Sequence, residues 1–125
     1  MALSLGRCGQ MELVVTAADT AQTLGTGDVP VLSTPRIVEL CEQAAVRALA
    51  GECAEGQTSV GFRVEVTHVA PVAIGSKVVA AATLERTEGK RLVFNVNVID
   101  RCGLVAAGRV TRVLVDTAQF LDKAR

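Results

Sequence analysis

The chain is poor in aromatic side chains. It contains no Trp and no Tyr, and its three Phe residues are Phe62, Phe94 and Phe120. Half of its 125 residues are nevertheless hydrophobic, which is enough for the core of one domain. That core must be built from Val, Leu, Ile and Ala, and the stiff β-branched side chains among them favour strands. The composition therefore predicts a single, sheet-rich domain over residues 1–125.

An excess of charge of either sign is also absent, because 13 Lys and Arg residues balance 13 Asp and Glu residues. Nucleic-acid binding usually needs a basic surface, and single-strand binding usually adds aromatic stacking platforms. We therefore expect no nucleic-acid partner. No hydrophobic run approaches the length of a membrane span, and polar residues interrupt residues 1–10, where a secretory leader would need an apolar stretch. These absences predict a cytoplasmic protein without a membrane partner.

Metal-binding and disulfide patterns are missing as well. The four cysteines are Cys8, Cys41, Cys53 and Cys102. They include no C-x-x-C pair, and His68 is the single histidine. We expect reduced thiols, no metal and no cofactor. A Cys41 nucleophile activated by His68 is an alternative, but the adjacent carboxylate of Glu42 would raise the pKa of the thiol and disfavour the reactive thiolate.

One helix stands out in the pattern. Residues 34–50 carry a wide apolar stripe at helical spacing. Thr34 is placed to be the N-cap and Pro35 suits the first helical position, while Gly51 ends the helix. Glu42 lies at the border of the apolar stripe, apart from the row that defines the solvent side, which is Glu39, Gln43 and Arg47.

The other segments have the patterns of strands, loops and turns. Residues 57–70 alternate, with His68 last on the face that carries Phe62, while Gly61 points to the other face. Gly and Pro break residues 17–33 into a loop, and 117–125 form a tail. Strands are predicted at 11–16, 57–70, 76–87, 91–100 and 104–116, the later ones joined into an antiparallel meander.

This order of elements predicts an α+β domain. A sheet must bury one face, and the helix at 34–50 is the single element available to cover it, so an antiparallel sheet of about five strands must wrap around one central helix. This arrangement is the hotdog fold. Because one helix is a small cover for such a sheet, we expect residual apolar surface to drive formation of a homodimer, with a tetramer as the larger alternative.

Three polar residues are candidates for chemistry: Thr34, Glu42 and His68. A carboxylate can act as nucleophile or general base toward a thioester carbonyl, and an imidazole can move a proton near neutral pH. A backbone N–H at a helix start or at a Gly can hold the carbonyl oxygen. If Thr34 and Glu42 share one regular helix, they are about 12 Å apart along its axis. Either Thr34 then lies off the helix, or the site combines residues of two subunits, which we favour.

Longer stretches of the sequence resemble a known family. They are LGTGDVPVLSTP at residues 24–35, ELCEQAAVRAL at 39–49, QTSVG at 57–61, VTHV at 66–69 and GKRL at 89–92. In order and spacing they are similar to the fluoroacetyl-CoA thioesterase family of hotdog proteins, over roughly residues 12–122.

The resemblance implies a homodimeric enzyme that cleaves an acyl-CoA to a carboxylate and free CoA, with CoA entering as part of the substrate. It places Thr34, Glu42 and His68 in the catalytic positions, and Gly61 and Arg112 at positions that line the acyl site. A Gly leaves room for an acyl group to approach. Phe62, the aromatic residue near the proposed site, is also predicted to bind substrate. A small or short-chain acyl group is expected, and recognition of fluorine stays open.

Three other functions remain open from the sequence. A hotdog hydratase or dehydratase would use the same acid and His68 on an acyl thioester without hydrolytic water. A non-catalytic dimer would bind or sense acyl-CoA without turnover, although the retention of Thr34, Glu42 and His68 speaks against it. A purely structural dimer would bind no CoA. Release of free thiol separates hydrolysis from all three.

Overall fold

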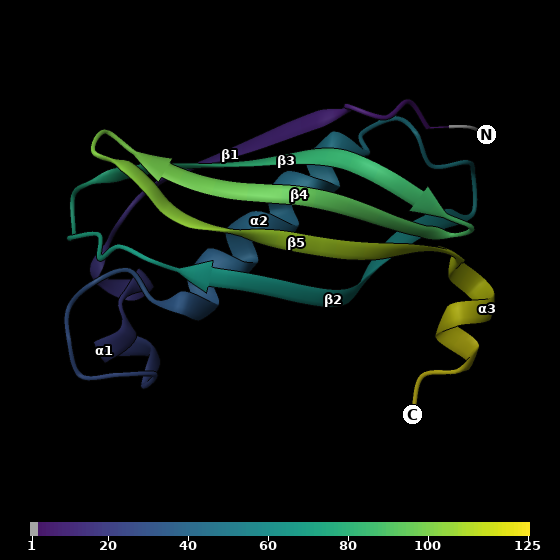
Figure 1. Cartoon of the computed structure of the whole chain (residues 1–125). Coiled ribbons are helices and arrows are strands. Elements are labelled where there is room, and N and C mark those ends of the chain that lie inside the picture. Colours follow the sequence, from purple (N-terminus) through teal and green to yellow (C-terminus); the bar gives the residue numbers. More distant parts are fainter. Residues whose placement is uncertain (1–2) are drawn as a thin grey trace.

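Five antiparallel strands form one curled sheet, and the computed structural model, which describes residues 3–125, shows this sheet wrapped around the helix α2 (Figure 1). The strands follow the spatial order β1-β3-β4-β5-β2, so β1 and β2 are the two edges. Their bounds are Cys8–Val14 for β1, Gln57–His68 for β2, Lys77–Glu88 for β3, Arg91–Asp100 for β4 and Gly103–Asp116 for β5. The predicted hotdog arrangement is confirmed.

The helix α2 runs from Thr34 to Ala48 and covers one face of the sheet. Its buried residues belong to the predicted apolar stripe: Ile37, Leu40, Cys41, Ala44, Ala45 and Ala48. They join aliphatic strand residues and Phe94 in one core, where burying each large side chain contributes about 1.5–3 kcal/mol. The helix packs mainly against β1 and β3 and less against β2. Polar groups can therefore lie between α2 and β2.

Several local predictions need correction. β1 begins at Cys8, three residues before the predicted strand. The N-cap of α2 is Ser33, whose Oγ accepts a hydrogen bond from the amide of Arg36 at 3.2 Å, so Thr34 is the first helical residue and not the cap. The predicted tail contains a short helix, α3 (Thr117–Asp122), because the carboxylate of Asp116 caps it by accepting from the Gln119 amide.

Two further observations concern the helices. Gln43 was expected on the solvent side of α2, but its Oε1 is buried and has no hydrogen-bond partner within residues 3–125. Among the same residues, no helix is both long enough and apolar enough to cross a membrane.

The loop before α2 is tied to the first turn of that helix. It contains a 3-10 turn, η1 (Ala17–Asp19), and a single helical turn, α1 (Ala21–Leu24). The Asp19 carboxylate accepts hydrogen bonds from Thr16 and from Nε of Arg36 at 3.0 Å. Burial raises the pKa of Asp19, but the Thr16 hydrogen bonds and the Arg36 guanidinium outweigh that effect and lower the pKa overall. Asp19 therefore stays ionised and fixes the segment that presents Thr34.

A bulge interrupts β2 between Gly61 and Arg63. A bulge inserts one residue, so the side chains before and after it exchange faces of the sheet. Gly61 consequently faces α2, where a Cβ would meet the Glu42 carboxylate, whereas Phe62 is 55% exposed. The strict alternation predicted for residues 57–70 is wrong at this point.

Gly9 of β1 marks the closest approach of the sheet to α2, and it generates a stability prediction. A Cβ there would collide with backbone atoms of Ala44 and Ala48, and backbone atoms cannot rotate away. We expect Gly9→Ala to lower the free energy of unfolding by about 1–3 kcal/mol in urea denaturation. The matched control is Cys8→Ala, an exposed position on the same strand, which should change it by less than about 0.5 kcal/mol. Equal midpoints for both variants would contradict the close packing.

Candidate active site

Thr34 and His68 meet where the start of α2 lies beside the end of β2. The Thr34 Oγ1 and the His68 Nδ1 are 2.9 Å apart, and the His68 Nε2 lies 2.9 Å from the carbonyl oxygen of Ala70. A carbonyl oxygen can only accept, so Nε2 carries the proton. In the neutral ring Nδ1 is then the acceptor, and the Thr34 hydroxyl donates to it. The Ala70 carbonyl thus fixes both the tautomer and the orientation of the imidazole.

Glu42 belongs to a second cluster, farther along α2. The Arg112 Nη1 donates to the Glu42 Oε2 at 3.0 Å, which makes an ion pair. Arg112 also donates through Nε to the Ser59 Oγ at 2.9 Å and through Nη2 to the Ser59 carbonyl oxygen at 3.0 Å. These contacts satisfy the guanidinium of Arg112, a residue that is only 8% exposed, as a buried charge requires. They also hold one carboxylate oxygen of Glu42 in a fixed place.

Gly61 makes room for that carboxylate. It pairs with Arg112 across the β2–β5 ladder, and a side chain at this position would occupy the space of the Glu42 Oε2. The bulge that follows Gly61 turns the strand so that Gly61 faces the helix. The Glu42 carboxylate and the Arg112 guanidinium therefore lie together between α2 and the backbone of β2.

The two clusters are separate within one chain. Thr34 and Glu42 both lie in the regular helix α2, so they are about 12 Å apart along its axis. The alternative in which Thr34 lies off the helix is therefore wrong. The structure brings Thr34 to His68 and brings Glu42 to Arg112 and Gly61. Within residues 3–125, no hydrogen bond or ion pair joins the two groups.

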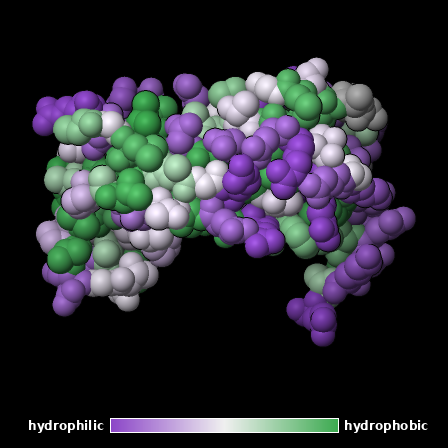
Figure 2. Space-filling view, viewed as in Figure 1, coloured by the Kyte–Doolittle hydropathy of each residue, from purple (hydrophilic) through white to green (hydrophobic). Residues whose placement is uncertain are grey.

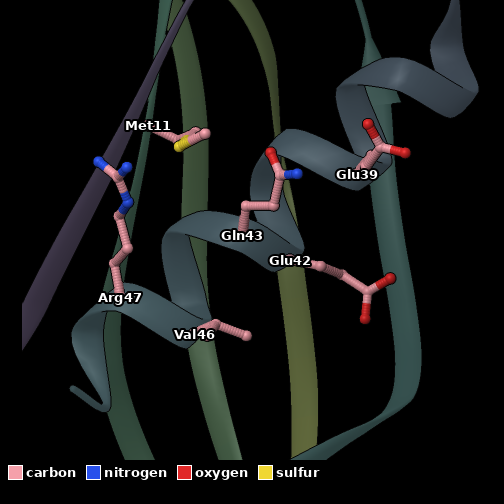
Figure 3. Close-up of a pocket in the computed structure, with 6 residues that line it drawn as sticks. All are labelled: Met11, Glu39, Glu42, Gln43, Val46 and Arg47. Carbon is pink, nitrogen blue, oxygen red and sulfur yellow. The ribbon is translucent and has the colours of Figure 1, made fainter. Parts of the chain in front are cut away.

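Each cluster borders an open groove. Glu42 lines a groove of about 380 Å³ over α2, together with Glu39, Gln43, Val46, Arg47 and Met11 of β1. Figure 3 shows the Glu42 side chain pointing to one side of the helix and Arg47 to the other. His68 lines a smaller groove of about 240 Å³ with Val31, Val69, Ala70 and Pro71. Both candidate chemical groups are thus accessible from solvent.

Phe62 does not line either groove. It lies at the bulge with the Arg91 guanidinium 4.5 Å from its ring centre, in the geometry of a cation–π contact. Leu92, the next residue after Arg91, is buried in the core, so Arg91 and the Phe62 ring lie on the face of the sheet away from α2. Within a single chain, the Phe62 ring therefore lies on the opposite face of the sheet from Glu42.

Cysteine and metal chemistry find no support in the arrangement of the described residues. Burial raises the pKa of the Cys41 thiol to about 11, so this cysteine holds its proton at neutral pH and is a poor nucleophile. The sequence predicts a raised pKa of this thiol from the neighbouring carboxylate; the pKa is raised, but burial is the cause. Within residues 3–125, no three His, Cys, Asp or Glu side chains come together as metal ligands.

The sequence did not point to Ser59 or Ala70. Ser59 holds Arg112 through both its hydroxyl and its carbonyl oxygen, and Ala70 acts through its backbone alone. Neither a serine hydroxyl on a strand nor a backbone carbonyl in a loop produces a recognisable pattern in the sequence. The contacts depend on the bulge and on the turn after His68, which become visible only in three dimensions.

Comparison with known proteins agrees with the family resemblance seen in the sequence. The family model described as fluoroacetyl-CoA-specific thioesterase matches residues 15–118. A fluoroacetyl-CoA thioesterase of Streptantibioticus cattleyicolor is 34% identical over 95 residues, which cover 76% of this chain and 68% of that protein.

Solved structures agree with the sequence relatives. A structure of the fluoroacetyl-CoA thioesterase FlK matches with a TM-score of 0.88 and 28% identity, covering 98% of this chain and 96% of that one. A hot-dog-like protein from Thermanaerovibrio acidaminovorans matches with a TM-score of 0.89 and 33% identity, covering 95% and 88%. The chain therefore belongs to the fluoroacetyl-CoA-specific thioesterase family and has the hotdog fold.

Proposed function

We propose that this protein is an acyl-CoA thioesterase that hydrolyses a small or short-chain acyl-CoA to a carboxylate and free CoA. The observation that carries the proposal is the Thr34–His68 pair at the edge of an open groove, with the imidazole tautomer set by the Ala70 carbonyl. Family membership supports the same reaction. CoA enters as part of the substrate, and the proposed chemistry uses no separate cofactor.

The reaction breaks the carbon–sulfur bond of the thioester and forms a carbon–oxygen bond. In the proposal, the Glu42 carboxylate drives this attack, either directly or by taking a proton from water. The Thr34 backbone amide, at the first position of α2, holds the developing negative charge on the carbonyl oxygen. The Thr34 hydroxyl joins it when the protonated His68 ring donates to the Thr34 Oγ1 instead of accepting from it. The doubly protonated ring of His68 delivers a proton to the departing thiolate of CoA and takes one back from water as the cycle closes, so it alternates between imidazolium and neutral imidazole.

Arg112 and Gly61 have supporting roles in this scheme. Arg112 binds one oxygen of Glu42, Oε2, which leaves the second oxygen of this groove-lining residue available for the reaction. Gly61 lets the strand backbone lie against the carboxylate, where an acyl group that reaches Glu42 must also fit. A wide acyl group would have to displace these contacts, which is why a small one is proposed. In this proposal, Phe62 contacts only a substrate that is bound in the site of the other subunit.

We further propose a homodimer in which β2 is the meeting edge. β2 pairs with β5 on one side, and its other edge presents unpaired backbone groups that a second β2 can satisfy. Phe62 of β2 is 55% exposed at the bulge of this strand, and Val46 is 48% exposed on α2 in the groove that Glu42 lines. Such a dimer lets Thr34 and His68 of one subunit meet Glu42 of the other. A cytoplasmic location stays a prediction, as does a tetramer.

The first prediction concerns hydrolysis itself. Incubation with a panel of acyl-CoAs, from acetyl and fluoroacetyl to branched, aromatic and long chains, should release free thiol fastest with a small acyl group. Glu42→Gln should lower kcat by a factor of about 100 or more, because it removes the attacking or basic carboxylate. The matched control is Glu55→Gln, an exposed carboxylate that lines neither groove, which should retain the rate. No thiol release from any acyl-CoA would overturn hydrolysis and leave hydration or binding.

The second prediction concerns the imidazole. His68→Ala should lower kcat by a factor of about 100 or more, since no other group at the groove can deliver a proton to the thiolate. Thr67→Ala alters the neighbouring exposed residue and should leave kcat unchanged. Thermal unfolding of both variants checks that the fold is retained. A normal rate for His68→Ala would reduce this residue to a structural role.

The third prediction tests which subunits form the site. Thr34→Ala and Glu42→Gln dimers should each be inactive. When the two variant chains are unfolded together and refolded in equal amounts, half of the dimers are mixed, and each mixed dimer has one site with both native residues. Activity should therefore return to about a quarter of the native value. If each site lies within one chain, mixing restores nothing.

A further inference from the structure

We propose that a groove at the far end of the sheet binds the nucleotide end of CoA, with its adenine ring and phosphate groups. The groove lies between the β2–β3 connection and the β4–β5 turn, the two loops at the left of Figure 1. This inference rests on the proposed function, because it names the part of the substrate that is remote from the thioester.

The size and the floor of the groove suit a flat aromatic ring. Its volume is about 800 Å³, within the range of small-molecule sites. Val79 of β3 and Ile99 of β4 are cross-strand neighbours and line the groove with Pro71. Ile99 is 46% exposed although it lies in a strand. Figure 2 shows hydrophobic residues gathered over this end of the face in view and hydrophilic residues over its middle.

The rim of the groove carries positive charge suited to phosphate. Lys77 and Arg101 both line it, and Ser76 adds a hydroxyl. Lys77 has one weak partner, Glu12, at 3.6 Å with both side chains exposed, and such a pair contributes little. Arg101 makes no ion pair within residues 3–125. The side chains of Lys77 and Arg101 are therefore available to bind the phosphate groups.

The acidic residue at the rim is already engaged. Asp100 also lines the groove, but its Oδ1 accepts hydrogen bonds from the amides of Cys102 at 2.8 Å and Gly103 at 3.1 Å. These hydrogen bonds stabilise the β4–β5 turn and orient the Asp100 carboxylate toward the backbone. Asp100 thus shapes the turn that presents Arg101, and its charge is partly offset by two amide dipoles.

The position of the groove fits the path of the substrate. Pro71 lines both this groove and the smaller groove that contains His68. A thioester held at His68 can therefore extend its pantetheine arm over Pro71 and place the nucleotide beyond it. The other grooves fit phosphate less well: Glu39 and Glu42 border the one over α2. In the groove beside β2, Arg109 is bound through two hydrogen bonds to Glu85.

The test is a comparison of KM values for long and truncated substrates. Lys77→Glu and Arg101→Glu should each raise KM for the acyl-CoA by about tenfold, with kcat unchanged, because each removes a cation–phosphate contact. Neither should change KM for the same acyl group on pantetheine, which lacks the nucleotide. The control Lys90→Glu changes charge equally at the β3–β4 turn, at the opposite end of the sheet, and should leave both values unchanged. Unchanged KM in both rim variants would overturn the inference while leaving hydrolysis established.

A binding measurement makes the inference independent of turnover. Adenosine 3′,5′-bisphosphate should bind the native protein in calorimetry, and Lys77→Glu and Arg101→Glu should weaken this binding by about tenfold. If no acyl-CoA is hydrolysed but the bisphosphate binds, the proposed hydrolysis is wrong and the nucleotide site in the groove is supported. If the bisphosphate does not bind, the groove is not a nucleotide site. A change of sedimentation in Ile99→Glu without any effect on bisphosphate binding would instead make this face a contact between copies of the chain.

Discussion

The packing of one helix onto a five-stranded sheet is the constraint on which the other features depend. Within residues 3–125, α2 is the one helix packed along the sheet, and it approaches β1 so closely that Gly9 has no room for a Cβ. Small side chains at Ala44, Ala45 and Ala48 allow this approach. Because the helix leans toward β1 and β3, its other flank stands over β2 with space for polar side chains. Both candidate clusters lie along that flank.

Burial of a guanidinium explains much of the geometry around Glu42. An unpaired buried charge would cost several kcal/mol, and Arg112 avoids this cost through Glu42 and both polar groups of Ser59. The bulge after Gly61 aligns these partners, since it turns Ser59 and Gly61 toward the helix while Val64 and Val66 still pack on the core. A strand without the bulge would place one of the two sets in solvent.

The Thr34–His68 pair depends on a different device. Ser33 takes the capping role, so the Thr34 hydroxyl can face the imidazole instead of the helix amides. The ionised Asp19 fixes the chain on both sides of this point, through its carboxylate to Arg36 and through its carbonyl oxygen to the Ser33 amide at 2.9 Å. The hydroxyl is thus presented by a network that contains no catalytic candidate. The same network ties the loop before α2 to the groove beside His68.

Local patterns in the amino-acid chain were sufficient for the elements and for the choice of polar candidates. The apolar stripe of α2, the alternation in the strands and the turn residues are periodic over neighbouring positions, and hydrophobic burial acts on that periodicity. The family resemblance, which includes Thr34, Glu42 and His68, could likewise be recognised from the sequence alone. The cap at Ser33, the bulge after Gly61 and the helix α3 were misjudged, because each is decided by a single hydrogen bond or an inserted residue that breaks a pattern.

The partnerships among the candidates were settled by the fold alone. Thr34 and His68 are 34 positions apart, and Glu42 and Arg112 are 70 positions apart, so their contacts require the register of β2 on β5 and the placement of α2 over both. Helical geometry keeps Thr34 from Glu42 within one chain, and packing turns Phe62 to the far face with Arg91. Composition and spacing determine which chemical groups are present, but long-range packing determines which of them touch, because a contact between distant segments has no local signal.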